Sequence, residues 1–170
     1  MSKVYYLAYG SNLHPRRLAE RVPSATAIGV VELSGYRLAF HKRSADGSGK
    51  YMFYARQSNE QKIYCVLYQL DASEKVALDA VEGVGMGYVA EQIKVDFAGK
   101  SYKSFIYNVE PAFIVPDLSP YSWYKKLVIA GAKYHGFPAS YIAAIQSVRS
   151  IVDQDEMRSS EHEELLTWLD

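Results

Sequence analysis

The sequence predicts one α+β domain spanning residues 1–170, and three observations lead to this prediction. A chain of 170 residues has the usual size of a single domain, and no internal repeat or low-complexity segment marks a boundary. Short aromatic and aliphatic runs, separated by Gly or polar turns, fill most of residues 3–109, as strands do. Apolar residues at helical spacing dominate after residue 120.

The predicted strands are short and rich in β-branched and aromatic residues. The polar stretch 57–62 and the sequence Ala98-Gly99-Lys100 each separate two such runs, which indicates two hairpins. Both faces of Ile63–Tyr68 are apolar or aromatic, so this strand should be buried on both sides, in a barrel or under helices. The strands in chain order are Lys3–Tyr9, Thr26–Leu33, Tyr36–His41, Tyr51–Arg56, Ile63–Leu70, Gln92–Phe97 and Ser101–Val109.

Helices are predicted from apolar spacing and from capping residues. Ser73 is a good N-cap for a segment that Gly83 ends, with Val76, Leu78 and Val81 as its apolar contacts. The acidic run 153–164 is expected to be an exposed linker, and residues 43–50 a mobile loop. The other predicted helices are Leu13–Val22, Tyr121–Tyr134, Pro138 to about Ile151, and a terminal helix of about 160–170 with Leu165, Leu166 and Leu169 facing inward.

Composition and charge exclude several classes of function. Lys+Arg and Asp+Glu are equal at 19 each, which argues against nucleic acid as the main partner. The single cysteine, Cys65, permits no internal disulfide and lies in an apolar run typical of an inert core thiol. The four histidines lack metal-ligand spacing, so no metal is expected. With no secretory signal and no apolar run of roughly 20 residues, a cytoplasmic protein without membrane contact is predicted.

Tyrosine is unusually frequent, at 15 residues against 6 Phe and 2 Trp. A tyrosine ring can be buried while its hydroxyl finds a polar partner, which suits a polar cavity inside an apolar shell. Aromatic residues are also favoured in strands for their packing alone, and the sequence leaves both interpretations open.

The first candidate site segment is Tyr6-Leu7-Ala8-Tyr9-Gly10-Ser11-Asn12, where a predicted strand ends in Gly-Ser-Asn and a helical turn follows. Glycine lets the backbone approach a ligand closely, and free N–H groups at a helix start can bind a carboxylate or an oxyanion. The same residues also fit an ordinary strand-to-helix turn with Ser11 or Asn12 as the cap.

The second candidate segment is Leu78–Tyr88, in which Glu82 ends a short helix before a loop with three glycines. A carboxylate in this position faces the negative end of the helix dipole, which disfavours ionisation. Such a residue is either a solvated surface glutamate or a general acid/base. The residues alone do not choose between these two hypotheses.

Three segments in the same order resemble the gamma-glutamylcyclotransferase family. They are the Tyr-Gly-Ser-Asn segment at 9–12, the Leu-Asp-x-x-Glu-Gly segment at 78–83, and the Tyr-Lys-Lys-apolar-Gly-Ala-Lys helix at 124–133 with Gly136-Phe137-Pro138 after it. The resemblance spans residues 5 to about 148. The spacing of the loop 84–88 is variable in the family, which leaves open how Tyr88 is aimed.

The resemblance implies a small mixed or antiparallel β-barrel flanked by helices, with the pocket at one barrel end. It implies that Glu82 is the catalytic acid/base, and that the substrate is bound by the segment Tyr6–Ser11, which continues into Asn12, and by Tyr124. No cofactor or metal is implied. Self-association as a homodimer is compatible with the family but cannot be derived from the residues.

The implied reaction converts a gamma-glutamyl amino acid or amine into 5-oxoproline and the free amine. The substrate's own α-amino group attacks its γ-carbonyl, so no Ser-His or Cys-His pair is required. Two alternatives stay open: the same chemistry on an isopeptide-linked or carrier-bound gamma-glutamyl conjugate, and a non-catalytic member that binds a small metabolite. The sequence identifies neither the leaving amine nor the pathway.

Overall fold

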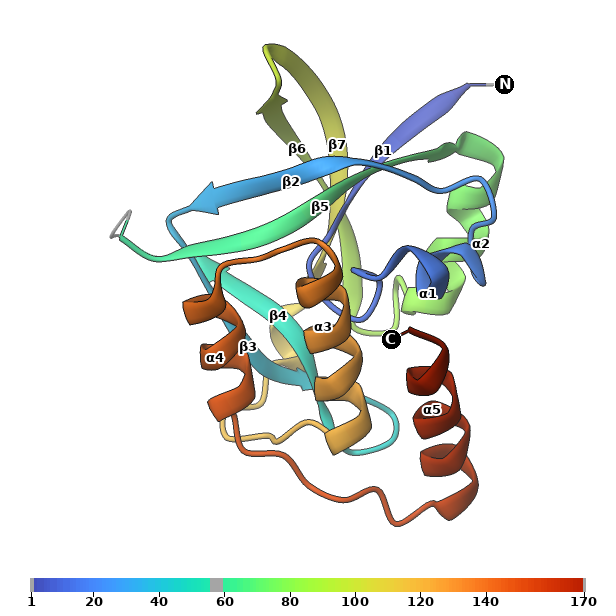
Figure 1. The fold of residues 1–170 in the computed structure, drawn as a ribbon, viewed down its shortest axis with the longest axis vertical. Coiled ribbons are helices and arrows are strands. Elements are labelled where there is room, and N and C mark those ends of the chain that lie inside the picture. Colours follow the sequence, from blue (N-terminus) through green and yellow to red (C-terminus); the bar gives the residue numbers. More distant parts are fainter. Residues whose placement is uncertain (1, 56–59, 170) are drawn as a thin grey trace.

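The computed structural model describes residues 2–55 and 60–169, and Figure 1 shows how its elements are arranged. The predicted hairpin loop at 57–62 falls partly outside these residues. The described elements, in chain order, are β1 Lys3–Ala8, α1 Pro15–Ala19, β2 Thr26–Ser34, β3 Tyr36–Arg43, β4 Gly49–Ala55, β5 Lys62–Asp71, η1 Ala72–Glu74, α2 Lys75–Glu82, β6 Tyr88–Phe97, β7 Lys100–Val109, η2 Pro111–Phe113, α3 Ser122–Tyr134, α4 Ala139–Ser147 and α5 Glu156–Leu169. Every predicted strand is present, so the α+β prediction is confirmed.

The strands form two sheets. Five of them lie in the order β2-β5-β1-β7-β6, and β3 and β4 make a separate antiparallel hairpin. Within the larger sheet only β1 and β7 are parallel neighbours. The chain turns away between β2 and β3 at Gly35, whose φ of 82° favours glycine. The sheet is mixed, as predicted, but the ladders of the described residues do not close it into a barrel.

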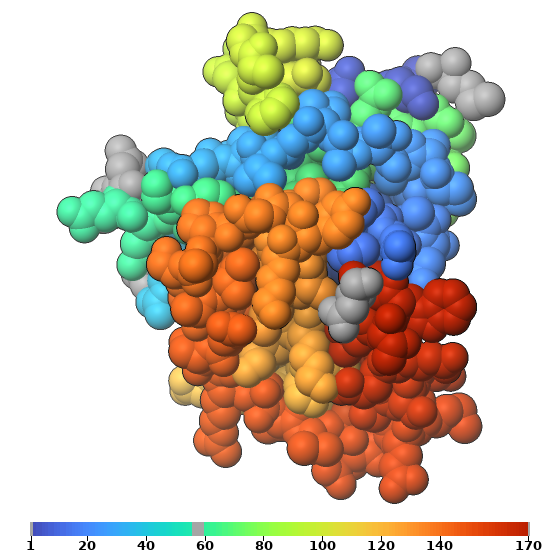
Figure 2. Space-filling model, in the orientation of Figure 1, coloured from blue at the N-terminus to red at the C-terminus, as the bar shows by residue number. Residues whose placement is uncertain are grey.

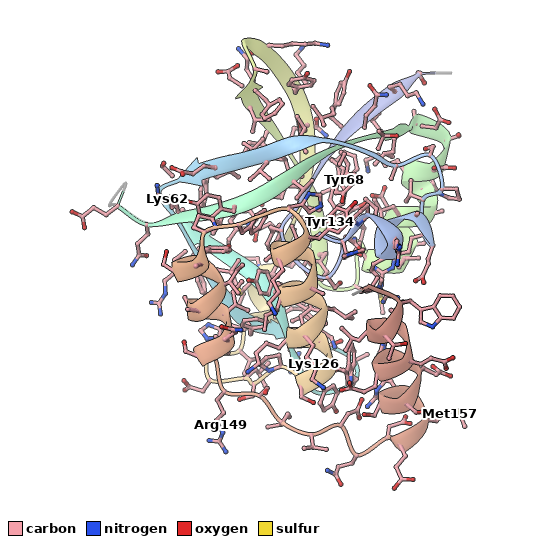
Figure 3. All side chains as sticks on the ribbon, in the orientation of Figure 1. Lys62, Tyr68, Lys126, Tyr134, Arg149 and Met157 are labelled. Carbon is pink, nitrogen blue, oxygen red and sulfur yellow. The ribbon has the colours of Figure 1, made fainter. Side chains whose placement is uncertain are left out.

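Strand β5 lies at the centre of the molecule and is buried along most of its length, as the apolar character of both its faces predicts. Helices α3 and α4 cover one side of it (Figure 1). At the end of α3, the Tyr68 hydroxyl lies 3.2 Å from His135 Nε2 (Figure 3). At the start of α4, the Tyr64 ring packs edge-on against Tyr141, with ring centroids 5.0 Å apart. Helices α3 and α4 therefore pack on the sheet through aromatic contacts.

Helix boundaries differ from the prediction in several places. Helix α1 is only five residues long and begins at Pro15 instead of Leu13. Ser73 lies inside η1 and caps nothing, because α2 follows η1 directly with no side-chain cap. Of the apolar contacts predicted for α2, only Leu78 is buried, whereas Val76 is 74% and Val81 54% exposed. Gly83 does end α2, in the left-handed conformation with φ 73°. Helix α4 ends at Ser147, short of Ile151.

The acidic run 153–164 is not a linker, because its residues from Glu156 onward belong to α5. Most of these residues are exposed, as predicted, but Asp153 is buried. Asp153 is 4% exposed and accepts hydrogen bonds from Trp123 Nε1 at 2.9 Å and from Arg158 Nε at 2.7 Å. Asp155 caps α5, since its carboxylate accepts the Arg158 N–H at 3.0 Å. The helix therefore starts at Glu156. Its residues, in red in Figure 2, form part of the face that the figure shows.

Helix α5 is held against α3 by polar contacts and ring stacking as well as by apolar contacts. Lys126 on α3 pairs with Glu163 at 2.7 Å (Figure 3). The His162 ring stacks on Trp123 with centroids 3.7 Å apart and an interplanar angle of 16°. Of the leucines predicted to face inward, Leu169 is buried and Leu165 and Leu166 are half-buried. The inward face of the terminal helix is thus confirmed.

His162 gives the fold a predictable dependence on pH. Burial, together with the charges of Arg17, Lys50 and Arg21, lowers the pKa of His162 from 6.5 to about 4. Between these two pH values the unfolded chain binds a proton that the folded chain does not. The contribution of His162 to stability is therefore fully present above pH 6.5 and is lost as the pH drops toward 4.

We expect His162→Phe, which keeps the stack on Trp123, to lose less stability than the unmodified chain between pH 7 and pH 5. Urea midpoints measured at the two pH values test this expectation, and an identical fall in both proteins would contradict it. Burial also lowers the pKa of His14 and of His135, so part of the slope should remain.

Candidate active site

Glu82 lies at the centre of a hydrogen-bonded cluster formed by three separate segments. Its carboxylate oxygen Oε1 accepts from Asn12 Nδ2 at 2.8 Å and from Arg21 Nη1 at 2.7 Å. Arg21 Nη1 also donates to Asn12 Oδ1 at 2.7 Å, which closes the cluster. The Glu82 side chain is 16% exposed, so it is neither a freely solvated surface group nor sealed from water. The fold thus unites the two candidate segments predicted from the sequence.

A narrow chamber adjoins this cluster. Asn12 Nδ2, in addition to its bond to Glu82, lies 3.2 Å from the Tyr6 hydroxyl and links the carboxylate to the chamber wall. Tyrosine rings from β1, β6, β7 and α3 supply most of that wall, which favours the interpretation of the many tyrosines as the lining of a polar cavity. The lining residues are Tyr6, Tyr9, Gly10, Ser11, Asn12, Glu82, Tyr88, Tyr107 and Tyr124.

Three of the five tyrosine hydroxyls of the chamber are held by backbone groups. Tyr9 donates to the Tyr107 carbonyl at 2.6 Å, Tyr88 donates to the Tyr51 carbonyl at 2.7 Å, and Tyr124 accepts the Tyr51 N–H at 3.3 Å. Burial raises the pKa of Tyr9, Tyr88 and Tyr124 above the ordinary value, so these phenols stay neutral at physiological pH. The chamber therefore offers neutral polar groups on a rigid frame.

Outside the chamber lies a wider cleft of about 440 Å³, whose lining includes four basic residues, Arg21, Lys42, Arg43 and Lys50. It shares Ser11, Glu82, Tyr88 and Tyr124 with the chamber, so Glu82 lies where the two spaces meet. The loop 43–50, predicted to be mobile, contributes to this cleft. Within it, Asp46 accepts from the Ser48 N–H at 2.9 Å and pairs with Lys50 at 2.9 Å, so the loop is tied down by its own side chains.

The turn after β1 differs from the predicted helix start. The Leu13 N–H donates to the Gly10 carbonyl at 3.1 Å, and the cap of α1 is His14, whose Nδ1 accepts the Arg16 N–H at 3.2 Å. Neither Ser11 nor Asn12 caps the helix, so the prediction of a helix N-terminus at Gly10–Ser11 is wrong. The segment is a turn, and Asn12 is free to point at Glu82 because it does not serve as a cap.

The predicted substrate residues fall into two groups. Six of them line the chamber, namely Tyr6, Tyr9, Gly10, Ser11, Asn12 and Tyr124. The other two, Leu7 and Ala8, are fully buried in the core and do not line it. Sequence reasoning missed Arg21, Lys42 and Tyr107, because a single cation or a strand tyrosine carries no local signal. Tyr88, whose orientation the sequence leaves open, forms part of the chamber wall.

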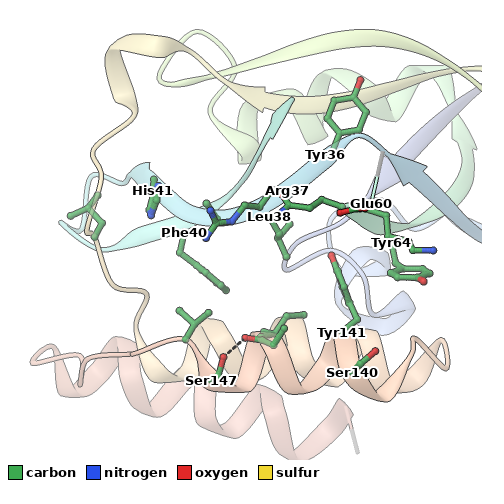
Figure 4. Close-up of a pocket in the computed structure, with 17 residues that line it drawn as sticks. Tyr36, Arg37, Leu38, Phe40, His41, Glu60, Tyr64, Ser140, Tyr141 and Ser147 are labelled. Atoms are coloured by element: carbon green, nitrogen blue, oxygen red, sulfur yellow. Dashed lines mark hydrogen bonds between the residues drawn. The ribbon is translucent and has the colours of Figure 1, made fainter. Parts of the chain in front are cut away.

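A larger cavity of about 590 Å³ lies between β3 and α4, and Figure 4 shows that Phe40 and Tyr141 point into it. It contains none of the predicted site residues. Among residues 2–55 and 60–169, no group of three or more His, Cys, Asp or Glu could hold a metal ion. Cys65 is fully buried, and burial raises the pKa of its thiol. Within the described part of the chain, no helix is long and apolar enough to cross a membrane.

Comparisons with known proteins show which family the chain resembles. The AIG2-like family model matches residues 62–145, which include Glu82 and Tyr124. Gamma-glutamylcyclotransferase from Mus musculus is 30% identical over 153 residues, which cover 84% of this chain and 77% of that protein. The chain belongs to the gamma-glutamylcyclotransferase family. The Homo sapiens member is 29% identical with the same coverage.

Structural similarity extends the relationship over nearly the whole chain. A solved structure described as gamma-glutamyl cyclotransferase superimposes with a TM-score of 0.84 at 26% identity and covers 98% of this chain and 99% of its own. A second solved chain, from Homo sapiens and described as uncharacterised, gives a TM-score of 0.80 at the same identity. The gamma-glutamylcyclotransferase-like α+β fold implied by the sequence motifs is therefore confirmed. Its mixed sheet is open, because the ladders of the described residues do not close it into a barrel.

Proposed function

We propose that this member of the gamma-glutamylcyclotransferase family converts a gamma-glutamyl amino acid or amine into 5-oxoproline and the free amine. The observation that carries the proposal is the position of Glu82, at the junction of a tyrosine-lined chamber and an open cleft. The chamber itself holds only about 20 Å³, so the glutamyl part would lie in the cleft against the residues that the two spaces share. A carboxylate beside that space matches the needs of an intramolecular acyl transfer.

In the proposed step, the α-amino nitrogen of the substrate attacks its own γ-carbonyl carbon. A C–N bond forms and closes the five-membered lactam, and the original amide C–N bond breaks. An α-ammonium group with a pKa of about 7.7–8.0 is mostly protonated at neutral pH and cannot attack. The ammonium nitrogen carries three protons and the lactam nitrogen keeps one. Glu82 therefore takes two protons from it in turn, one before the attack and one from the tetrahedral intermediate, and passes both to the leaving nitrogen, which departs as an ammonium group. General acid–base catalysis of this kind contributes roughly 10²–10⁴-fold.

Asn12 and Arg21 position the carboxylate for this task. Both donate to the same oxygen, Oε1, at 2.8 and 2.7 Å. None of the described residues donates a hydrogen bond to Oε2. The second oxygen is thus the one available to exchange a proton with the substrate. Because Arg21 is fixed in turn by Asn12 at 2.7 Å, the carboxylate has little rotational freedom.

The tyrosine wall of the chamber supplies the remaining requirement, which is to hold the glutamyl chain in attack geometry. Effective molarities of about 10⁵–10⁸ M show how large this positional effect can be. The neutral hydroxyls of the chamber can orient the α-amino and α-carboxylate groups without adding charge. The backbone N–H groups of the turn at Gly10 and Ser11 could hold the developing oxyanion, a role worth roughly 10²–10³-fold per donor, or could hold the α-carboxylate.

Two alternatives share the glutamyl half of this site. The first is the same reaction on an isopeptide-linked or carrier-bound gamma-glutamyl conjugate, which would place a larger group in the outer cleft. The second is a non-catalytic binder of a small metabolite, which would have no use for a carboxylate at the junction. The expectations of a single domain, of a cytoplasmic location and of a homodimer that needs no cofactor stay predictions.

A substrate panel tests the proposal. The purified chain is incubated with gamma-glutamyl-alanine, gamma-glutamyl-ethylamine and gamma-glutamyl-ε-lysine, and 5-oxoproline is measured by chromatography. Release from at least one compound is the expected result. Release from the ε-lysine conjugate alone would favour the isopeptide alternative. Ligand binding without any release across the panel would overturn the proposed function in favour of the binder.

A further inference from the structure

Lys42 is a cation in an unusual environment at the outer cleft. It is 8% exposed and lies on β3, beside the loop that follows Glu82. Its ammonium lies 4.7 Å from the centroid of the Tyr88 ring. Its Nζ makes no hydrogen bond or ion pair with any described residue, and it reaches the solvent of the cleft although the rest of the side chain is covered. The ammonium therefore has a charge to offer to an anion that enters the cleft.

The other cations of the cleft are already satisfied or exposed. Arg21 pairs with Glu82 at 2.7 Å, and Lys50 pairs with Asp46 at 2.9 Å. Arg43 is exposed, so water can solvate it. Among the described residues that line the cleft, Lys42 is therefore the largely covered lysine whose charge is not already paired.

The loop 83–88 fixes Lys42 close to Glu82. Gly87 has a φ of 120°, and a Cβ there would lie 3.1 Å from Lys42 Cε, so the glycine leaves room for the lysine stem. Tyr88, the next residue, supplies the ring under the ammonium. The same loop starts at the end of α2, which carries Glu82. The lysine and the glutamate are thus positioned by one rigid segment and face one cleft.

We propose that Lys42 determines specificity for the leaving group by binding the α-carboxylate of a leaving amino acid. This inference rests on the proposed function and names the substrate class of that same site. The leaving nitrogen must lie at Glu82 to receive its proton. In an amino acid a single carbon separates that nitrogen from the α-carboxylate, so the carboxylate enters the outer cleft next to the nitrogen. A gamma-glutamyl amine has no carboxylate there, and in an ε-linked lysine the carboxylate is several carbons away.

The experiment uses two substrates that differ by this one group, gamma-glutamyl-alanine and gamma-glutamyl-ethylamine. We expect the unmodified chain to prefer the alanine conjugate in kcat/KM by about 10–100-fold, the size of a charge-assisted hydrogen bond. Lys42→Met keeps the length of the side chain and removes the charge. It should lower kcat/KM for the alanine conjugate by the same factor, largely through KM, and leave the ethylamine conjugate within about twofold.

Matched controls separate this role from a structural one. Lys94→Met removes an exposed lysine on β6 and should change neither substrate. Lys42→Gln provides a second neutral variant and should repeat the selective loss. An equal fall with both substrates, or no fall with either, would overturn the inference.

Direct binding keeps the inference independent of turnover. If the chain releases no 5-oxoproline, calorimetry with the same two compounds still tests Lys42. Tighter binding of the alanine conjugate, lost in Lys42→Met, would support the carboxylate site while the proposed reaction fails. Equal binding of both compounds to the unmodified chain would overturn the carboxylate site itself.

Discussion

Glu82→Gln should abolish the release of 5-oxoproline while the protein still folds and binds ligand. Glutamine has nearly the same size as glutamate, and its amide oxygen can accept the same bonds from Asn12 and Arg21 that hold Oε1. It cannot carry a proton from one nitrogen to another. We expect kcat to fall by about 10²–10⁴-fold, the usual contribution of a general acid/base, with KM changed much less.

The measurement is steady-state release of 5-oxoproline, accompanied by calorimetric binding and thermal unfolding of the variant. Asp79→Asn is the matched control, because Asp79 lies on the same helix and accepts the Tyr107 hydroxyl at 2.6 Å from the edge of the chamber. It should retain turnover within about tenfold, since its carboxylate does not line the chamber or the cleft. Substantial turnover by Glu82→Gln would remove Glu82 from the mechanism.

Gly131→Ala should lower both stability and activity, although the same substitution on an exposed helix normally stabilises by about 1 kcal/mol. Gly131 lies in the last turn of α3, against the turn that follows β1. An added Cβ would lie 2.4 Å from Leu13 Cβ and 2.8 Å from the His14 nitrogen. The backbone at His14 cannot yield easily, because the neighbouring Leu13 carbonyl accepts from Tyr68 at 2.7 Å.

Overpacking of this kind costs roughly 1–3 kcal/mol, and for a chain of this length Tm falls by roughly 2–4 °C per kcal/mol. The turn also carries Asn12 and Ser11, and displacement of a positioning group by 1 Å can cost about 100-fold in rate. We therefore expect kcat/KM to fall by about 10–100-fold together with a lower melting temperature. Lys133→Ala, on the exposed side of the same helix, should do neither. A raised melting temperature with full activity in Gly131→Ala would show that α3 does not set the position of the turn.

The strands were predictable because their signal is local. The two apolar faces of Ile63–Tyr68 identify a strand buried on both sides, and β5 has this burial. Gly83 was predicted to end α2 and does so in the conformation that glycine favours. The start of α5 was missed although a signal existed, since Asp155 is a good N-cap three residues before Arg158. The acidic character of that segment was interpreted as exposure, and the buried pair of Asp153 with Trp123 depends on a contact between distant residues.

The sequence by itself determined the fold class and the family resemblance, and it singled out Glu82 as the candidate acid/base, because periodicity and short motifs are local features of the chain. Only the tertiary structure decided what surrounds that carboxylate. Arg21 and Asn12 reach Glu82 from segments 61 and 70 residues away. Lys42 comes from the β3–β4 hairpin and lines the same cleft as Glu82. The energy between two charges depends on their distance in space and not on their separation along the chain. The residues around Glu82 can therefore be identified only from the folded chain.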